Sequence, residues 1–234
     1  MISPGECWVW WATPNTVSPD DAIVLSRAER CRLDSFRKPD NRARFLCAAV
    51  LLRRLVAVET GIVAAQVAVD RTCAGCGDAH GRPQLVGLDL HTSIAHSGNR
   101  VGVALTRAGT VGLDVEQAVP RDFQRLAGRM LRGTEQASGL GEFYRYWTRK
   151  ESVLKATGAG LTGGLRQVVV SPPHEPARLE SYPGVAGLTA AMYDLSPGSG
   201  YLAAITVLNT ASCQVVEQWW PATGRLASSA RRRV

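Results

Sequence analysis

Residues 90–117, LHTSIAHSGNRVGVALTRAGTVGLDVEQ, say more about the architecture of this chain than any other segment. Apolar and polar residues alternate along it, which is the pattern of half-buried strands. Turn-forming residues interrupt the pattern at Ser97-Gly98-Asn99 and again at Arg107-Ala108-Gly109. We therefore expect strands joined by short turns at the centre of the chain.

The segments on either side predict helices and further strands. A helix is expected over 18–36, starting at Ser18 and Pro19, and a more apolar one over 41–61, stopped by Gly61. CWVWWA, at residues 7–12, reads as a strand. Further helices are expected over 121–131, 134–140 and 141–158, and further strands near 66–72, 166–171, 187–193, 201–208 and 213–220.

Helices and strands occur in both halves, so the sequence predicts an α+β protein in two lobes. We place the boundary near residue 108, with a first lobe over 1–108 and a second over 109–225. The basic residues 226–234 are expected to form a disordered tail.

Length and composition indicate a globular protein. The chain has 234 residues, of which 45% are hydrophobic and 20% charged. No apolar run approaches the roughly 18 residues of a membrane span, and the N-terminal residues lack the features of a signal peptide. We therefore expect a cytoplasmic protein that does not enter a membrane.

Six cysteines do not change that expectation, because most lie in contexts typical of buried thiols. Cys73 and Cys76, with His80 after them, have zinc-like spacing. A second pair is missing, although structural zinc takes four ligands. Buried thiols are therefore favoured over a zinc site or a redox pair.

Positive charge is concentrated near the N-terminus. The chain has a formal net charge of +7, and residues 27–54 hold nine basic side chains against three acidic ones. Such density indicates a polyanionic partner, either nucleic acid, a phosphorylated small molecule or an acidic protein. A solvated arginine-rich helix is the alternative.

Two carboxylates follow one another in VGLDVEQ, residues 111–117. On a strand, Asp114 and Glu116 share one face, roughly 7 Å apart, and the apolar residues share the other. Neighbouring carboxylates repel each other, and Mg²⁺ relieves that repulsion when phosphate oxygens and water complete its shell. A solvent-facing strand edge is the alternative for an isolated D-x-E.

The segment WTRKESVLKATGAGL, residues 147–161, holds two of the only three lysines in the chain. Trp147, Glu151 and Lys155 are spaced by four residues and form one stripe of the expected helix. Charges beside a large buried aromatic need partners. Glu151 can therefore join Asp114 and Glu116 as a third carboxylate, with an ammonium beside them for a phosphate.

These two motifs together resemble the surfactin-type 4′-phosphopantetheinyl transferases. GLDVEQ and WTRKESVLKATGAGL correspond to the two halves of that family's signature. AHSG at residues 95–98 and HGRP at 80–83 resemble two further family segments, and the early arginines resemble its basic cluster. The resemblance covers residues from about 25 to 165.

The resemblance implies a fold of two similar lobes with coenzyme A in the cleft between them. It implies Mg²⁺ held by Asp114, Glu116, Glu151 and the pyrophosphate. The phosphopantetheinyl arm would pass to a serine of an apo acyl or peptidyl carrier protein, with release of adenosine 3′,5′-bisphosphate. Glu151 would also be the candidate base, directly or through water, and Lys155 would face the pyrophosphate. A monomer is implied, because one chain would hold both halves of the site.

On the nucleotide side, the resemblance assigns the 3′-phosphate to a set of early arginines. Lys150 is expected along the cleft wall, toward the nucleotide or the carrier. Ala95 stands where the family usually has serine, so one hydroxyl contact is missing. The implied nucleotide-binding residues are Arg27, Arg30, Arg44, Arg82, His96, Lys150 and Lys155.

Two other functions remain open at this point. One is a non-catalytic nucleic-acid binder that uses residues 27–54, although that stretch has only Phe36 and Phe45 as aromatic residues for stacking. The other is a different Mg²⁺-dependent enzyme that processes nucleotides. The resemblance to the transferases favours coenzyme A and a carrier protein as partners, and not nucleic acid.

Overall fold

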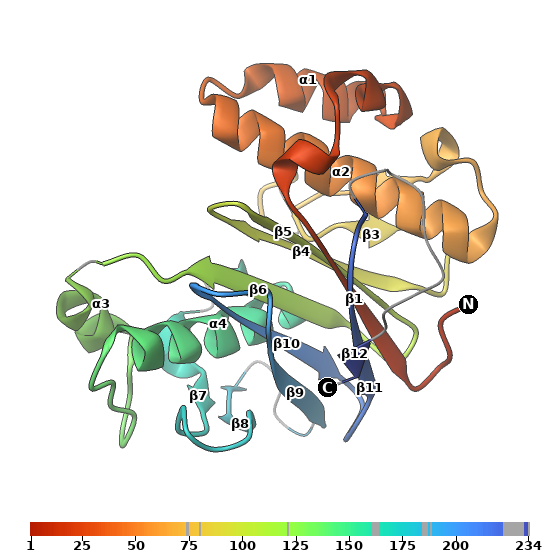
Figure 1. Ribbon diagram of the computed structural model, residues 1–234. Helices are drawn as coiled ribbons and strands as arrows, with labels where there is room; N and C mark the ends of the chain where they lie inside the picture. Colours follow the sequence, from red (N-terminus) through yellow and green to blue (C-terminus); the bar gives the residue numbers. More distant parts are fainter. Residues whose placement is uncertain are drawn as a thin grey trace.

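The computed structural model describes residues 1–73, 75–79, 81–120, 122–160, 164–183, 187, 189–221 and 232–233. Helices and strands occur in both halves of this part of the chain, which confirms the α+β class. Four layers follow one another: the helices α1 and α2, a first sheet, a second sheet, and the helix α4 (Figure 1).

The first sheet has the strand order β12-β11-β1-β5-β4. Its central strand β1 runs parallel to β11 and antiparallel to β5. Side chains of β1 alternate between two cores: Trp10 packs with α2, and Trp11 faces the second sheet. The bounds are β1 (Glu6–Ala12), β4 (His91–Ser97), β5 (Arg100–Thr106), β11 (Gln214–Trp219), β12 (Arg232–Arg233), α1 (Arg27–Ser35) and α2 (Pro39–Thr60).

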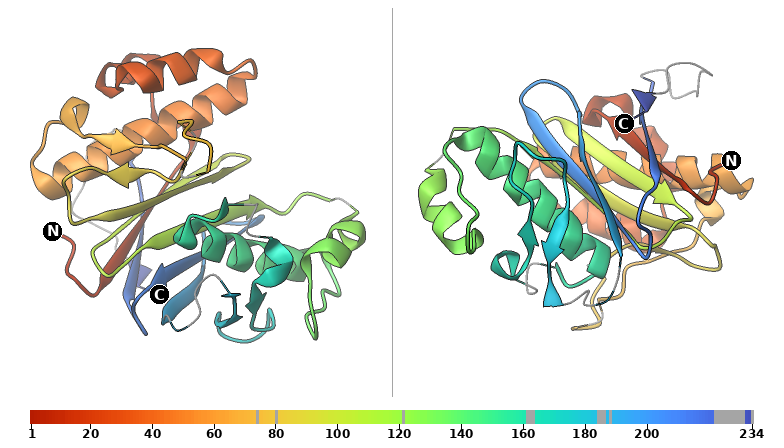
Figure 2. Two further views of the ribbon diagram at one scale, coloured as in Figure 1. Left: turned by 180° about the vertical axis from the view of Figure 1, so that it is seen from behind. Right: turned by 90° about the horizontal axis from the view of Figure 1, so that it is seen from below.

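The second sheet has the order β6-β10-β9, with antiparallel neighbours. Leu113 and Ile205 face the core between the sheets, and the opposite face packs on α4, as the views from behind and below show (Figure 2). The bounds are β6 (Val111–Gln117), β9 (Ala190–Leu195), β10 (Tyr201–Leu208), α3 (Phe123–Met130) and α4 (Leu140–Thr157).

Short elements complete the described fold. The 3-10 helices are η1 (Pro14–Thr16), η2 (Pro19–Val24), η3 (Ala64–Gln66) and η5 (Leu165–Gln167). The small two-stranded sheets pair β2 (Val69–Asp70) with β3 (Gln84–Leu85), and β7 (Val169–Val170) with β8 (Leu179–Ser181).

Helix α4 lies very close to β6, and Gly112 makes this possible. A Cβ atom at Gly112 would lie 1.9 Å from the carbonyl oxygen of Ser152. The Ser152 hydroxyl is hydrogen-bonded to that of Thr206 on β10, at 2.7 Å, so the helix is held at this depth. The close approach brings the side chains of α4 over the carboxylates of β6.

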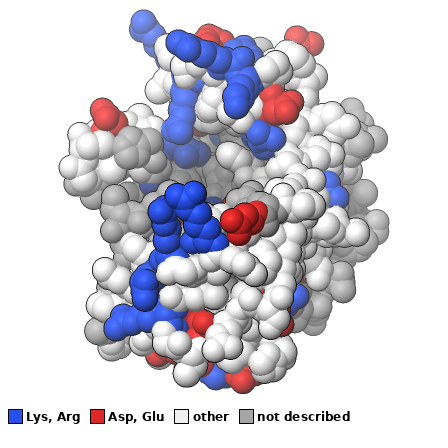
Figure 3. Space-filling view, turned by 90° about the vertical axis from the view of Figure 1, so that its left-hand side faces the viewer, with Lys and Arg blue, Asp and Glu red and all other residues white. Residues whose placement is uncertain are grey.

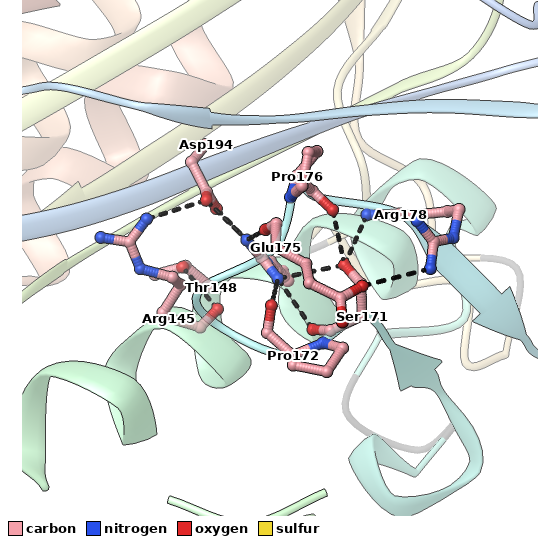
Figure 4. Close-up of polar contacts among 9 residues, drawn as sticks. Arg145, Thr148, Ser171, Pro172, Glu175, Pro176, Arg178 and Asp194 are labelled. Carbon is pink, nitrogen blue, oxygen red and sulfur yellow. Dashed lines mark hydrogen bonds and ion pairs between the residues drawn. The ribbon is translucent and has the colours of Figure 1, made fainter.

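A buried arginine on α4 fastens the surrounding loops. Arg149 is completely buried and donates hydrogen bonds to both carboxylate oxygens of Asp194 and to the backbone carbonyls of Ser171, Pro172 and Glu175. Figure 4 shows how Asp194 and Ser171 lie within this network. The β7–β8 connection and β9 are therefore tied to one side of α4.

Most of the expected elements are confirmed. The strands over 90–117 are β4, β5 and β6. The helix expected over 18–36 is instead divided into η2 and α1, because Ser26 and Glu29 form a capping box that starts a new helix. The helix expected over 134–140 is wrong, since regular helix begins only at Leu140.

The expected lobe boundary does not describe the first sheet completely. β11, expected in the second lobe, pairs with β1 from Glu6 to Trp11. Arg232 and Arg233, in the tail expected to be disordered, pair with Glu217 and Val216. Residues 222–231 and 234 lie outside the described part.

Candidate active site

Asp114 lies at the centre of the site, on the face of β6 that packs on α4. Only 5% of the residue is exposed. Its Oδ1 accepts a hydrogen bond from Lys155 Nζ at 2.7 Å, while its buried Oδ2 accepts none from the described residues. Burial raises the pKa of Asp114 to about 7; the Lys155 charge lowers it, and Glu116 and Glu151 raise it.

Glu116 is oriented by a serine that sequence reasoning missed. Ser97 donates a hydrogen bond from its hydroxyl to Glu116 Oε2, at 2.8 Å, and accepts one from the backbone N–H of Gln117 at 3.1 Å. Ser97 stands in the AHSG segment, so the position was marked, but its partner lies on another sheet.

Glu151 on α4 is the third carboxylate. It is 8% exposed, and burial raises its pKa; Lys155 lowers it and Glu116 raises it. Among the described residues, no group of three or more His, Cys, Asp or Glu side chains is placed so that it could hold a metal ion by itself. The structure thus shows three mutually repelling carboxylates, two of which, Asp114 and Glu151, interact with the Lys155 ammonium.

A cavity of about 540 Å³ opens beside Lys155. Arg82, expected on the nucleotide side, lines it and donates to the carbonyl of Ala156 at 2.8 Å. Ala95 is buried in its wall. The lining residues are Arg71, Cys73, Gly81, Arg82, Pro83, Ser93, Ile94, Ala95, His96, Leu154, Lys155, Gly158, Ala159 and Gly160.

His96 and Arg71 give this cavity its electrostatic character. Desolvation lowers the pKa of His96, as do the charges of Lys155, Arg44 and Arg71. Arg71 was not singled out from the sequence. Its Nε is buried and donates a hydrogen bond to none of the described groups.

The early arginines do not all come together. Arg44 on α2 donates to the Gly98 carbonyl at 2.9 Å and lines a second, mostly apolar cavity of about 740 Å³. Arg27 and Arg30 on α1 are exposed and line neither of these two cavities. One face of the molecule nevertheless gathers Lys and Arg side chains above and below a recess (Figure 3).

Lys150 is placed differently from what the sequence indicated. Its side chain is fully buried, and its Nζ donates to Glu135 Oε2 at 2.7 Å and to the carbonyls of Met130 and Val168. Every donor of the ammonium is used inside the protein. The expectation that Lys150 lies along a cleft wall is therefore corrected: it joins α4 to the segments before and after it.

Two further findings concern sequence features other than the three carboxylates. All six cysteines are present as thiols rather than disulfides, and His80 lies outside the described residues. No helix in the described part of the chain has the length and apolar character needed to cross a bilayer.

Comparison with known proteins agrees with the site. The model of the 4′-phosphopantetheinyl transferase superfamily matches residues 110–206, which include both carboxylate-bearing elements. A Synechocystis protein assigned to the 4′-phosphopantetheinyl transferases is 31% identical, over 72% of this chain and 71% of that protein. The 4′-phosphopantetheinyl transferase HetI of Nostoc is 29% identical, with 83% of each chain covered. The 4′-phosphopantetheinyl transferase Sfp of Bacillus subtilis is 28% identical, over 60% of this chain and 62% of Sfp. The chain belongs to the 4′-phosphopantetheinyl transferase family and is an enzyme of that class.

Proposed function

We propose that this enzyme transfers the 4′-phosphopantetheine arm of coenzyme A to a serine of an apo acyl or peptidyl carrier protein, with Mg²⁺, and releases adenosine 3′,5′-bisphosphate. One observation carries the proposal. The buried Asp114, with an unpartnered Oδ2 and two neighbouring carboxylates, lies beside a cationic cavity large enough for a nucleotide. Phosphoryl transfer depends on such positioning and charge neutralisation.

The donor set fits Mg²⁺. Asp114, Glu116 and Glu151 offer only oxygen ligands; burial is the main cause of the raised pKa of Asp114, and a divalent cation would offset it together with the smaller repulsion from Glu116 and Glu151. The set is not a complete cluster by itself. Mg²⁺ usually keeps few carboxylates and completes its shell with phosphate and water, so we propose these three residues as its protein ligands. When bound, the ion would neutralise charge on the pyrophosphate.

The remaining side chains have distinct roles in the proposed reaction. Arg71, Arg82 and His96 bind the nucleotide part of coenzyme A in the cavity. Lys155, which is 30% exposed while paired with Asp114, presents its ammonium to the phosphate that becomes the leaving group. Glu151, whose pKa is raised by burial, accepts the serine proton directly or through one water.

We propose that this cavity belongs to a cleft between two lobes. Its walls come from residues 71–96, before the proposed boundary near 108, and from residues 154–160, after it. One chain thus supplies both walls, which supports a monomer. Cysteines kept as thiols are typical of a reducing compartment and support a cytoplasmic location.

The direct test is to incubate the protein with an apo carrier protein, coenzyme A and Mg²⁺. We expect the carrier to gain the mass of one phosphopantetheinyl arm, and we expect EDTA to prevent this. Cleavage of coenzyme A without a gain on the carrier would instead indicate a nucleotide hydrolase. Full transfer in EDTA would refute the metal assignment.

A second substrate tests the early arginines, for which the support is their charge and position. Dephospho-coenzyme A lacks the 3′-phosphate, so we expect a higher KM for it than for coenzyme A. Arg44→Glu should remove that difference, because Arg44 is near enough to lower the pKa of His96. Equal KM values in the wild type would show that Arg27, Arg30 and Arg44 have another role, such as docking an acidic carrier.

A further inference from the structure

Cys73 and Cys76 lie together in a short loop between β2 and β3. The backbone N–H of Gly77 donates to the carbonyl of Cys73 at 2.9 Å, and the N–H of Cys73 donates to the carbonyl of Asp78 at 2.8 Å. The first bond joins residues four apart in the sequence, so it brings Gly77 back to Cys73. The Cys76 side chain hydrogen-bonds to the Cys73 thiol, so the two sulfur atoms lie next to each other, as the formation of a disulfide requires.

The two thiols have different surroundings. Backbone N–H groups of Cys76 and Gly75 hydrogen-bond to the Cys73 sulfur and lower its pKa, as does the Cys76 side chain. Cys76 is exposed, and its sulfur lies 3.5 Å from Asp78 Oδ2. Since the thiolate is the nucleophile, Cys73 is the attacking thiol and Cys76 is the thiol that completes the disulfide.

The loop is also part of the nucleotide cavity. Cys73 lines that cavity together with Arg71 and Arg82. The loop is fixed at its base by the N–H of Gly81, which donates to the Arg71 carbonyl at 2.7 Å. A second anchor is Arg32 of α1, which donates to the Ala79 carbonyl at 2.8 Å. Because this loop forms part of the cavity wall, a bond between the two sulfurs would change the shape of the cavity.

We propose that Cys73 and Cys76 form a dithiol modification site that low-molecular-weight disulfides oxidise, and that the resulting disulfide weakens nucleotide binding in the adjoining cavity. Cys73 attacks the small disulfide and releases one thiol, which leaves a mixed disulfide on Cys73. Cys76 then loses its proton, attacks Cys73 and releases the second thiol. The protein is oxidised by two electrons and the small disulfide is reduced to two thiols.

The consequence for binding rests on the proposed function, whereas the chemistry does not. The test treats the whole protein with oxidised glutathione and maps its peptides by mass spectrometry. We expect the peptide that holds Cys73 and Cys76 to lose two hydrogen atoms. Cys76→Ser should instead retain one glutathione on Cys73. Cys31→Ser removes an exposed thiol on α1 and is the matched control, which should behave as the wild type.

Steady-state kinetics then test the coupling to the cavity. In the oxidised wild type we expect the KM for coenzyme A to rise on the order of tenfold, as for the loss of one charged hydrogen bond, with kcat unchanged and full recovery in dithiothreitol. In Cys73→Ser the ratio of KM values with and without oxidant should stay near one.

Three results would overturn the proposal: no oxidation of this peptide, a disulfide to another cysteine, or a disulfide that leaves KM unaltered. Zinc that remains bound to the purified protein and blocks the exchange would also overturn it and make this a metal site. If the disulfide forms but the reduced protein transfers nothing, the proposed function fails while the dithiol site stands.

Discussion

Replacing Asp114 by asparagine tests whether the ionised form of this buried carboxyl group destabilises the folded protein. Burial raises its pKa from 3.8 to about 7, despite the pairing with Lys155. The unfolded chain releases this proton near pH 4, but the folded protein holds it until about pH 7. The folded state therefore binds more protons between these values, and its stability must fall as pH rises through that window.

The expected size follows from the shift. Each pKa unit corresponds to about 1.4 kcal/mol, so a shift of roughly three units lowers the free energy of unfolding by about 4 kcal/mol between pH 4 and pH 8. Asparagine cannot ionise and does not contribute this loss. Lys155 would lose its charged partner in the variant, although the amide oxygen of asparagine can still accept its hydrogen bond, and its side chain is 30% exposed so that water can solvate it.

The assay is urea unfolding of the wild type and Asp114→Asn from pH 4 to pH 8, without Mg²⁺. The difference in free energy of unfolding should move in favour of the variant as pH rises, and the slope of each urea transition should stay constant. The exposed Asp89→Asn variant is the control and should show no such trend. Mg²⁺ at pH 8 should stabilise the wild type only, because it binds the ionised carboxylate of the folded state.

A flat difference across the whole pH range would refute the reasoning. It would mean that Asp114 ionises in the folded protein as easily as in the unfolded chain. Equal stabilisation of both proteins by Mg²⁺ would place the ion elsewhere. Loss of transfer in Asp114→Asn alone would decide neither point, because the variant also removes the negative charge paired with Lys155.

Three further predictions concern α4 and its neighbours. Lys155→Ala should lower kcat by about 10²-fold or more with little change in KM, as steady-state kinetics with one carrier would show. Lys155→Arg should be impaired as well, because the planar guanidinium does not replace a compact ammonium beside Asp114. Lys150→Met should lower the free energy of unfolding by roughly 3–5 kcal/mol, because the buried Glu135 carboxylate loses its cationic partner and keeps only the backbone N–H groups of Arg132 and Val170. Adding Glu135→Leu should restore much of the loss in urea unfolding, and additive losses would contradict the pairing. Gly112→Ala should displace α4, because its Cβ would overlap the Ser152 carbonyl, so both Tm and transfer should fall; an unchanged Tm would contradict the close packing.

Local patterns in the sequence were sufficient to predict the strands of residues 90–117 and to predict that Asp114 and Glu116 lie on the same face of one strand. Side chains alternate on any strand, so this face follows from the backbone alone. The spacing of Glu151 and Lys155 likewise follows from the helix. Both motifs were therefore found before any tertiary structure, and the resemblance to the transferases rested on them.

Tertiary structure alone decided where Lys150 lies, whereas the stripe shared with Glu151 had already predicted that Lys155 faces the site. Lys150 and Lys155 lie on different sides of α4, but helical geometry does not say which side meets protein. Lys150 is buried against Glu135, which lies in the segment 134–140 that was predicted to be a helix. Lys155 is paired with Asp114. Each pairing joins residues distant in sequence, whose contact depends on how α4 packs.

Pairing between strands far apart in the sequence also could not be predicted from the sequence. β11 lies beside β1 although more than 200 residues separate Glu6 from Gln214, and a parallel neighbour needs no turn that could mark it in the sequence. Ser97 meets Glu116 only because two sheets pack together, and Arg71 lines the cavity beside Lys155 together with residues distant in sequence. Alternation and helical spacing determine which way a side chain points from its own element, whereas its partner depends on the packing of elements that local sequence does not encode.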